Sequence, residues 1–317
     1  MKSTLFIRRF VTVPALAAGL VLTATHADLQ TSQAHRSADP KTPPIWLAAG
    51  TAATRFGATV FERPGETYRH AFLRSRNTYG RFGAVRIFFP GLPHSWRSIR
   101  NNVGKTPVVA SFQAPPAEIL SGRYDHQLTH WFRTAPKDRL TRWNYWHEPE
   151  DDIERGSLNA AAYRRAFTHI ERLSDRAHNF RLRSTLILMC WTAEKNSGRS
   201  VRTYYPGDAV IDVMAWDCYN AGHRANRYRA PRELFRPAYR ASRLRSNNFA
   251  VAELGSVVVN GDTGARRARW LHTVAHYLRR HGASFCTYFD SNVGVDYRLS
   301  DRPSRRAWRG IVHSQWG

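Results

Sequence analysis

The chain has 317 residues, of which 42% are hydrophobic, and its formal charge at pH 7 is +24. This hydrophobic content excludes a disordered chain, and the length fits one α/β barrel of about 250 residues or two ordinary domains. A positive charge of this size favours an anionic partner such as nucleic acid, anionic lipid or acidic polymer.

The arginine bias of the chain offers a second explanation of this charge. Only five of the 48 basic residues are lysine, and the arginines are spread along the chain instead of forming one block. Such a bias is typical of a GC-rich coding sequence. We therefore expect the charge to favour electrostatic association with anionic cell-wall polymers without setting the function. We expect no specific nucleic acid, because the sequence contains no recognised binding motif for one.

The first residues have the pattern of a secretory signal peptide. A basic start is followed by an apolar run over residues 10–22 and by the small-residue pattern Thr25-His26-Ala27. This order predicts a signal peptide over residues 1–27 and a secreted, extracellular protein. The alternative is a membrane anchor, but the run is shorter than the roughly 20 residues that cross a bilayer. We expect no membrane span in the mature protein.

A single domain follows a polar leader. Residues 28–44 are rich in Ser, Thr, Gln and Pro, which is typical of a flexible segment. Beyond this leader the sequence shows no second linker, internal repeat or low-complexity block. The simplest organisation is one domain over residues 45–317.

Eight short apolar runs predict eight strands, several of them apolar throughout, as in a parallel sheet buried on both faces. In chain order they cover residues 56–61, 84–89, 107–112, 143–146, 184–190, 211–216, 249–252 and 284–289.

Amphipathic stretches between these runs predict helices. Apolar residues recur three and four positions apart, so they share one helix face. Strands that alternate with helices predict a (β/α)8 TIM barrel or an open doubly wound sheet. No glycine-rich phosphate motif follows a strand, which weighs against nucleotide binding. The predicted helices cover residues 66–79, 118–133, 160–177, 231–244, 265–281 and 303–313.

The three cysteines, Cys190, Cys218 and Cys286, do not suffice for a disulfide-dense scaffold. Each lies in or at the end of an apolar run, so the simplest interpretation is three small buried side chains. A bridge between Cys190 and Cys218 is the alternative for an exported protein.

Two glutamates come directly after apolar strands. Glu148 follows the fourth strand in the segment WHEP, and Glu253 follows the seventh in the segment AELG. A carboxylate there is costly unless it faces a polar cavity, and the carboxyl ends of barrel strands form such a site. Retaining glycoside hydrolysis needs two carboxyl groups about 5–5.5 Å apart, one protonated and one ionised.

These two segments resemble the acid/base and nucleophile motifs of the clan A glycoside hydrolases. Most clan members have Asn before the acid/base, whereas His147 stands here, which is similar to glycoside hydrolase family 26, the β-mannanase group. The resemblance covers nearly the whole mature chain. It implies a (β/α)8 fold and a retaining, endo-β-mannanase-like enzyme without metal or cofactor. Its substrate would be a polysaccharide of mannan or β-glucan type.

The resemblance also implies roles for single residues. Glu148 would be the acid/base and Glu253 the nucleophile. His147 would hydrogen-bond substrate or orient Glu148. Tyr219, in the segment WDCY after the sixth strand, would hydrogen-bond Glu253 and keep it ionised. Arg86 on the second strand would lower the pKa of the nucleophile by its opposite charge.

Aromatic and acidic side chains at other strand ends are further candidates for substrate binding. Trp146, Trp191 and Trp216 lie at strand ends, and Tyr288 lies on the eighth strand. Their faces suit stacking on sugar rings, while core packing is the alternative for at least one of them. Asp217 would bind sugar hydroxyls or tie loops together.

Other classes of site and protein fit the sequence less well. The acidic cluster that begins at Glu148 also suits Ca²⁺ or a helix start. A zinc site lacks the HExxH spacing, and a serine hydrolase lacks the GxSxG elbow. A non-catalytic glycan- or wall-binding barrel is the main alternative, motivated by the basic charge, but a pure binder has no need of two placed glutamates.

Overall fold

The structure is a computed structural model that describes residues 53–221, 226–245 and 247–316. The predicted signal peptide, residues 1–27, and the predicted leader, residues 28–44, lie outside the described residues, as does the start of the predicted domain.

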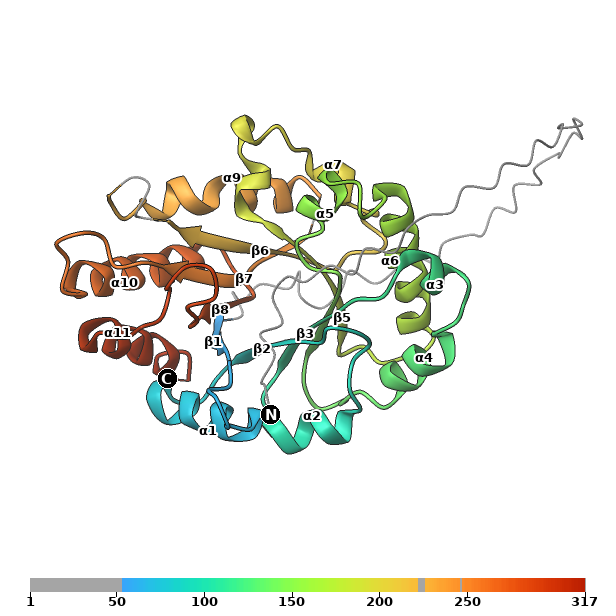
Figure 1. Ribbon diagram of the computed structural model, residues 1–317, viewed down its shortest axis with the longest axis horizontal. Coiled ribbons are helices and arrows are strands. Elements are labelled where there is room, and N and C mark those ends of the chain that lie inside the picture. The colour runs from blue at the N-terminus through green and yellow to red at the C-terminus, as the bar shows by residue number, and fades with distance from the viewer. Residues whose placement is uncertain (1–52, 222–225, 246, 317) are drawn as a thin grey trace, which may run out of the picture. The chain divides into compact units, whose positions relative to one another are not determined.

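Eight parallel strands close into a barrel in chain order, β1 to β8 (Figure 1). β8 pairs with β1 over five residues, which excludes the open doubly wound sheet and confirms the predicted (β/α)8 barrel. The strands are β1 (Arg55–Thr59), β2 (Ala84–Phe88), β3 (Val108–Phe112), β4 (Thr141–Tyr145), β5 (Leu182–Met189), β6 (Val213–Asn220), β7 (Asn248–Ser256) and β8 (Phe285–Phe289).

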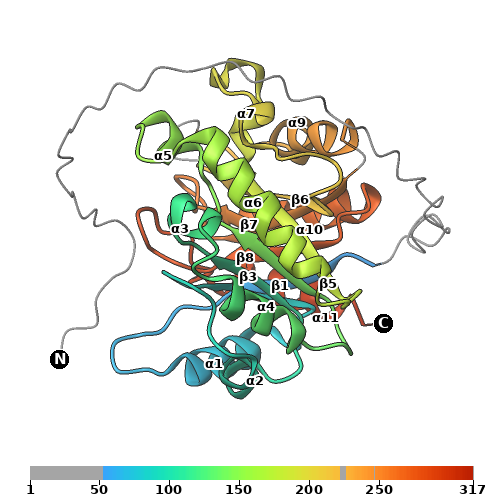
Figure 2. The same cartoon turned by 90° about the vertical axis from the view of Figure 1, so that its right-hand side faces the viewer.

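Helices lie around the outside of the barrel (Figures 1 and 2). Among the described helices, none is both long and apolar enough to span a membrane. They are α1 (Tyr68–Tyr79), α2 (Trp96–Val103), α3 (Pro116–Leu120), α4 (Asp125–Arg133), α5 (Glu150–Glu154), α6 (Ala160–Asp175), α7 (Val201–Tyr204), α9 (Pro231–Arg243), α10 (Ala265–Arg280) and α11 (Arg302–His313), with 3₁₀ turns η2 (Cys190–Ala193) and η3 (Lys195–Ser197).

The helices differ from the prediction at several places, and the short helices α5 and α7 were not predicted. The predicted helix over residues 118–133 is two helices, α3 and α4, because Gly122 adopts a positive φ of 77° between them. α2 was not predicted, although Ser95 caps its first turn and Trp96, Ile99 and Val103 bury one face.

Alternation along each strand separates two hydrophobic cores. Side chains that point outward pack under the helices, as Trp143 of β4 does against Phe167 of α6, with ring centroids 5.3 Å apart. Small and aliphatic side chains fill the barrel interior together with Phe285. This interior cluster consists of Ala84, Val109, Ile187, Val213, Ala215, Ala250, Ala252 and Phe285.

Strand β7 carries one residue more than either neighbour at the level of Ala252. On the β6 side Trp216 pairs with Val251 and Asp217 already pairs with Glu253, and the register also shifts on the β8 side. Such a bulge reverses the alternation and redirects the next side chain. Ala252 and Glu253 therefore both point to the interior. The hydroxyl of Thr287 donates to the carbonyl of Ala252.

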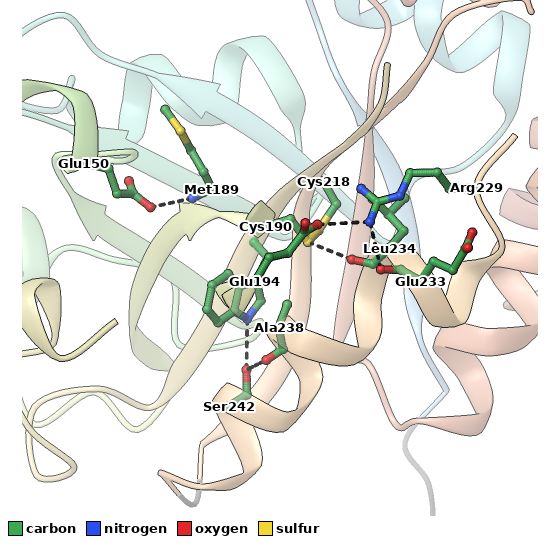
Figure 3. Close-up of a disulfide and its surroundings, with 11 residues drawn as sticks. Glu150, Met189, Cys190, Glu194, Cys218, Arg229, Glu233, Leu234, Ala238 and Ser242 are labelled. Atoms are coloured by element: carbon green, nitrogen blue, oxygen red, sulfur yellow. Dashed lines mark hydrogen bonds and ion pairs between the residues drawn. A yellow bond between two sulfur atoms is a disulfide. The ribbon is translucent and has the colours of Figure 1, made fainter. Parts of the chain in front are cut away.

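A disulfide joins Cys190, after β5, to Cys218 on β6 (Figure 3). This corrects the simplest interpretation of the cysteines and agrees with its alternative. Cys286 is a buried free thiol, and burial raises its pKa. Because Cys218 lies between Asp217 and Tyr219, the bridge fixes the strand segment that carries both.

Removal of this disulfide is expected to destabilise the protein by about 3–4 kcal/mol, because it releases a loop closed over 28 residues in the unfolded chain. Urea unfolding of the Cys190→Ala, Cys218→Ala double variant measures this. Reductant should destabilise the parent protein and leave the double variant unchanged. Equal unfolding free energies of the two oxidised proteins would contradict the expectation.

Candidate active site

The mouth of the barrel, where the strands have their carboxyl ends, brings Glu148 and Glu253 together. Glu148 follows β4 and Glu253 belongs to β7, and the charge of Glu253 acts on the carboxyl group of Glu148. Burial and this like charge raise the pKa of Glu148 well above its usual range. No side chain of the described residues hydrogen-bonds the Glu148 carboxyl group, so it is free to act on a ligand.

The backbone that presents Glu148 is strained. Trp146 and Glu148 both have positive φ, 54° and 48°. Their amides are held by neighbouring strands: the Trp146 N–H donates to the Phe112 carbonyl at 2.8 Å and the Glu148 N–H to the Ile187 carbonyl at 3.1 Å. The Trp146 indole also donates to Asp152 at 2.8 Å. Non-glycine residues in this region persist only where their surroundings hold them, typically at functional sites.

Glu253 is 4% exposed and has two partners, as predicted. The Arg86 guanidinium lies 3.8 Å from its Oε1, and the Tyr219 hydroxyl donates to its Oε2. Burial raises the pKa of Glu253, while Arg86 and Tyr219 both lower it. Since Glu148 has the stronger upward shift and no such donors, we assign the proton to Glu148 and the negative charge to Glu253.

A buried network fixes Arg86, and the sequence analysis did not identify its members. Arg86 donates to Ser111 Oγ at 2.7 Å, Ser111 donates to Asn144 Oδ1 at 2.9 Å, and Asn144 donates to the Thr185 carbonyl at 2.8 Å. The signal was present, because Ser111 and Asn144 are polar residues inside otherwise apolar strands.

Tyr219 is held by close packing. Its ring stacks on Tyr297 with centroids 4.7 Å apart. A Cβ atom on Gly255 would lie 2.5 Å from Tyr219 Cδ1, so only glycine leaves room for this ring beside β7. The glycine of the AELG segment thus has a physical role in directing the tyrosine to Glu253.

Asp217 lies at the same place in the barrel. It pairs with Glu253 across β6 and β7 and is 3% exposed. Neither carboxyl oxygen has a hydrogen-bond partner among the described residues. Burial and the charges of Glu253 and Glu148 raise its pKa well above the usual range. A protonated Asp217 can donate to a ligand oxygen at the floor of the site.

His147 lies between the site and β2. The centroid of its ring lies 5.1 Å from that of Phe88. The Arg86 guanidinium also packs on the Phe88 ring, 4.4 Å from its centroid. Burial and the charge of Arg86 lower the pKa of His147 to about 3. The imidazole is therefore neutral under ordinary conditions and has one donor and one acceptor nitrogen for a ligand.

The predicted aromatic platforms divide into two groups. Trp146 is half-buried beside Glu148, and Trp191 is 43% exposed after β5, with Arg199 4.1 Å from its centroid. Trp216 and Tyr288 are wholly buried on the outer face of the barrel, which corrects the prediction that they contact substrate. The Trp216 indole donates to Ser242 of α9, and the Tyr288 hydroxyl donates to the Tyr297 carbonyl.

The acidic cluster after Glu148 forms helix α5 and makes structural contacts. Glu150, its first residue, accepts from the Met189 amide at 2.8 Å (Figure 3) and from Thr192, and burial raises its pKa to about 7. Asp151 pairs with Arg199 at 2.6 Å. Among the described residues, no group of three or more His, Cys, Asp and Glu side chains is arranged to hold a metal ion.

Comparison with known proteins finds likeness in structure only. No family model and no curated sequence matches the chain. A glucosidase from Croceicoccus marinus has a TM-score of 0.60 at 11% identity, covering 83% of this chain and 68% of its own. A family 26 glycoside hydrolase from a Muricauda species has a TM-score of 0.56 at 14% identity, and the match covers 83% of this chain and 86% of that one. A family 26 β-mannanase from Bacteroides ovatus has a TM-score of 0.53 at 12% identity, and the match covers 83% of this chain and 89% of that one.

The class that these findings define is a (β/α)8 barrel with paired glutamates at the carboxyl ends of β4 and β7. The expected likeness to clan A and family 26 glycoside hydrolases is found at the level of the fold.

Proposed function

We propose that this protein is a secreted, retaining glycoside hydrolase with an endo-β-mannanase-like action on a β-linked polysaccharide of mannan or β-glucan type. One observation carries the proposal: Arg86 and Tyr219 contact the Glu253 carboxyl group and lower its pKa against the effect of burial, while Glu148 has a strongly raised pKa and no competing partner. The likeness of the fold to a β-mannanase and a glucosidase supports the substrate class. The disulfide and the signal-peptide pattern support export.

The reaction proceeds in two displacements. The Glu253 carboxylate attacks the anomeric carbon while Glu148 gives its proton to the departing glycosidic oxygen, so a glycosyl ester forms on Glu253. Glu148, now ionised, removes a proton from water, and this water attacks the anomeric carbon and releases Glu253. Two inversions retain the anomeric configuration. In this proposal Asp217 and His147 bind sugar hydroxyl groups during both steps.

The mature protein, incubated with mannans, β-glucans, xylans and anionic wall glycans, tests the proposal. We expect new reducing ends from a β-mannan or β-glucan, and none from the Glu148→Ala and Glu253→Ala variants. Absence of release from every polymer, with glycan binding intact, would replace this proposal by the glycan-binding alternative.

The Tyr219→Phe variant is expected to shift the acid limb of the pH–kcat/KM profile to higher pH. The hydroxyl of Tyr219 lowers the pKa of Glu253, so its loss raises that pKa and protonates the nucleophile earlier as pH falls. The alkaline limb, which belongs to Glu148, should move much less.

Tyr145→Phe is the matched control, because it removes a buried tyrosine hydroxyl that donates to the Ala114 carbonyl and not to a carboxylate. Its pH profile should match that of the parent. An unmoved acid limb in Tyr219→Phe would show that the tyrosine does not set the ionisation of Glu253.

A further inference from the structure

A groove of about 660 Å³ lies between α9 and α10, on the outside of the barrel. We call it the α9–α10 groove. No Asp or Glu lines it, whereas six basic side chains do: Arg232, Arg236, Arg240, His276, Arg280 and His281.

The arginines of α9 form a row along the groove. Arg232, Arg236 and Arg240 recur every four residues, which places them about 6 Å apart on one helix face. All three charges act on the hydroxyl of Tyr277 of α10, which lines the same groove. None of the three, nor Arg280, forms an ion pair within the part of the chain that the structure describes.

Other arginines on or next to these helices form ion pairs with acidic residues. Arg227, just before α9, pairs with Glu233 at 2.7 Å, and Arg266 of α10 lies 3.8 Å from Asp262. The row in the groove lacks such partners, so its charge is available to a ligand. A guanidinium binds a carboxylate with two parallel hydrogen bonds, which makes a row of arginines well suited to a chain of carboxylates.

The floor of the groove is aromatic and rigid. Tyr277 stacks on His281 with centroids 3.8 Å apart, and Tyr239 meets His281 edge-on at 4.8 Å. His281 Nδ1 is hydrogen-bonded to the Tyr277 carbonyl at 2.8 Å. Tyr277 also stacks on Phe235 with centroids 5.9 Å apart, so the rings offer mainly their apolar edges to the C–H surface of a sugar.

We propose that the α9–α10 groove docks a segment of an acidic polysaccharide that carries uronic acid residues. Such a polymer has both features that the groove matches, a carboxylate on each sugar and an apolar ring face. The volume lies in the range of sites for small ligands, of about 300–1,000 Å³, and so fits one carbohydrate chain. Docking there is separate from the catalytic mouth.

Binding of polygalacturonate at about 0.15 M salt, measured with the full mature protein, tests the groove. The triple variant Arg232→Gln, Arg236→Gln, Arg240→Gln should bind at least about tenfold more weakly, because it loses three carboxylate contacts. Its reducing-end release from a soluble neutral substrate should be unchanged, because the groove is not part of the mouth. Glu253→Ala should bind polygalacturonate as the parent does.

The matched control is the triple variant Arg97→Gln, Arg100→Gln, Arg165→Gln, which removes the same charge from exposed positions on α2 and α6. It should bind within about twofold of the parent if the groove is specific. Equal losses in both triple variants would reduce the effect to diffuse charge and overturn the proposal. If the groove triple variant lost binding to single-stranded DNA but kept its binding to polygalacturonate, the groove would be assigned to nucleic acid. That result would also overturn the proposal. Thermal unfolding of both variants controls for folding.

Discussion

The Glu253→Ala variant is expected to lose turnover by at least on the order of 10⁴-fold, because no covalent intermediate can form without the carboxylate. Azide or formate should restore part of the rate by occupying the space that the side chain leaves. Azide attack from the nucleophile's side gives a glycosyl azide of inverted configuration. Proton NMR of the product measures this configuration, and reducing-end release measures the rate.

Glu253→Gln is the matched control for this experiment. It removes the negative charge but keeps the volume, so azide has no room and should not restore activity. Arg86 and Tyr219 would face a neutral amide in this variant and an empty space in Glu253→Ala. Undiminished activity of either variant would refute the assignment of the nucleophile.

The Glu148→Ala variant is expected to lose most activity on substrates whose leaving group must be protonated, and least on substrates whose leaving group departs without a proton. On polysaccharide, whose departing alkoxide is a poor leaving group, kcat/KM should fall by about 10²–10⁴-fold, the usual contribution of general acid catalysis. An aryl glycoside with a strongly acidic phenol should lose much less in the first displacement. Kinetics on both substrates over a range of pH measure the difference.

The pH profile gives a second readout of the same residue. The raised pKa of Glu148 means that activity falls as pH rises through that pKa, since the acid then lacks its proton. This alkaline limb should disappear in Glu148→Ala on the activated aryl substrate. Azide should now give a product of retained configuration, because it replaces water in the second displacement. Equal losses on the two substrates would show that Glu148 is not the acid.

The barrel was predictable because its signals are local and repeated. Each of the eight apolar runs is a strand, since a strand buried on both faces must be apolar nearly throughout. Glu148 and Glu253 stood out for the same reason, as charged residues after such runs. Arg86 and Tyr219 contact Glu253, as the resemblance implied, whereas the sequence did not predict that Asp217 lies next to Glu253.

The prediction for Trp216 and Tyr288 was wrong because a position at a strand end does not by itself decide to which face of the sheet a side chain points. Asp217 follows Trp216 directly, so the two must point to opposite faces of β6, and only one of them can reach the mouth. The hydrogen bond from Trp216 to Ser242 of α9 depends on helix packing that a single sequence does not display. The disulfide likewise depends on the separation of β5 and β6, which spacing along the chain does not give.

The bulge at Ala252 has a consequence for how the gene of such a protein can change. Loss of the codon for the extra residue, Ala252, would restore the regular register and leave Glu253 opposite Asp217, still pointing to the barrel interior. Barrels of this kind can therefore differ by one residue in β7 and keep the carboxylate in the same place. A position-by-position alignment that allows no gap in this strand would pair Glu253 with residues that point outward to the helices.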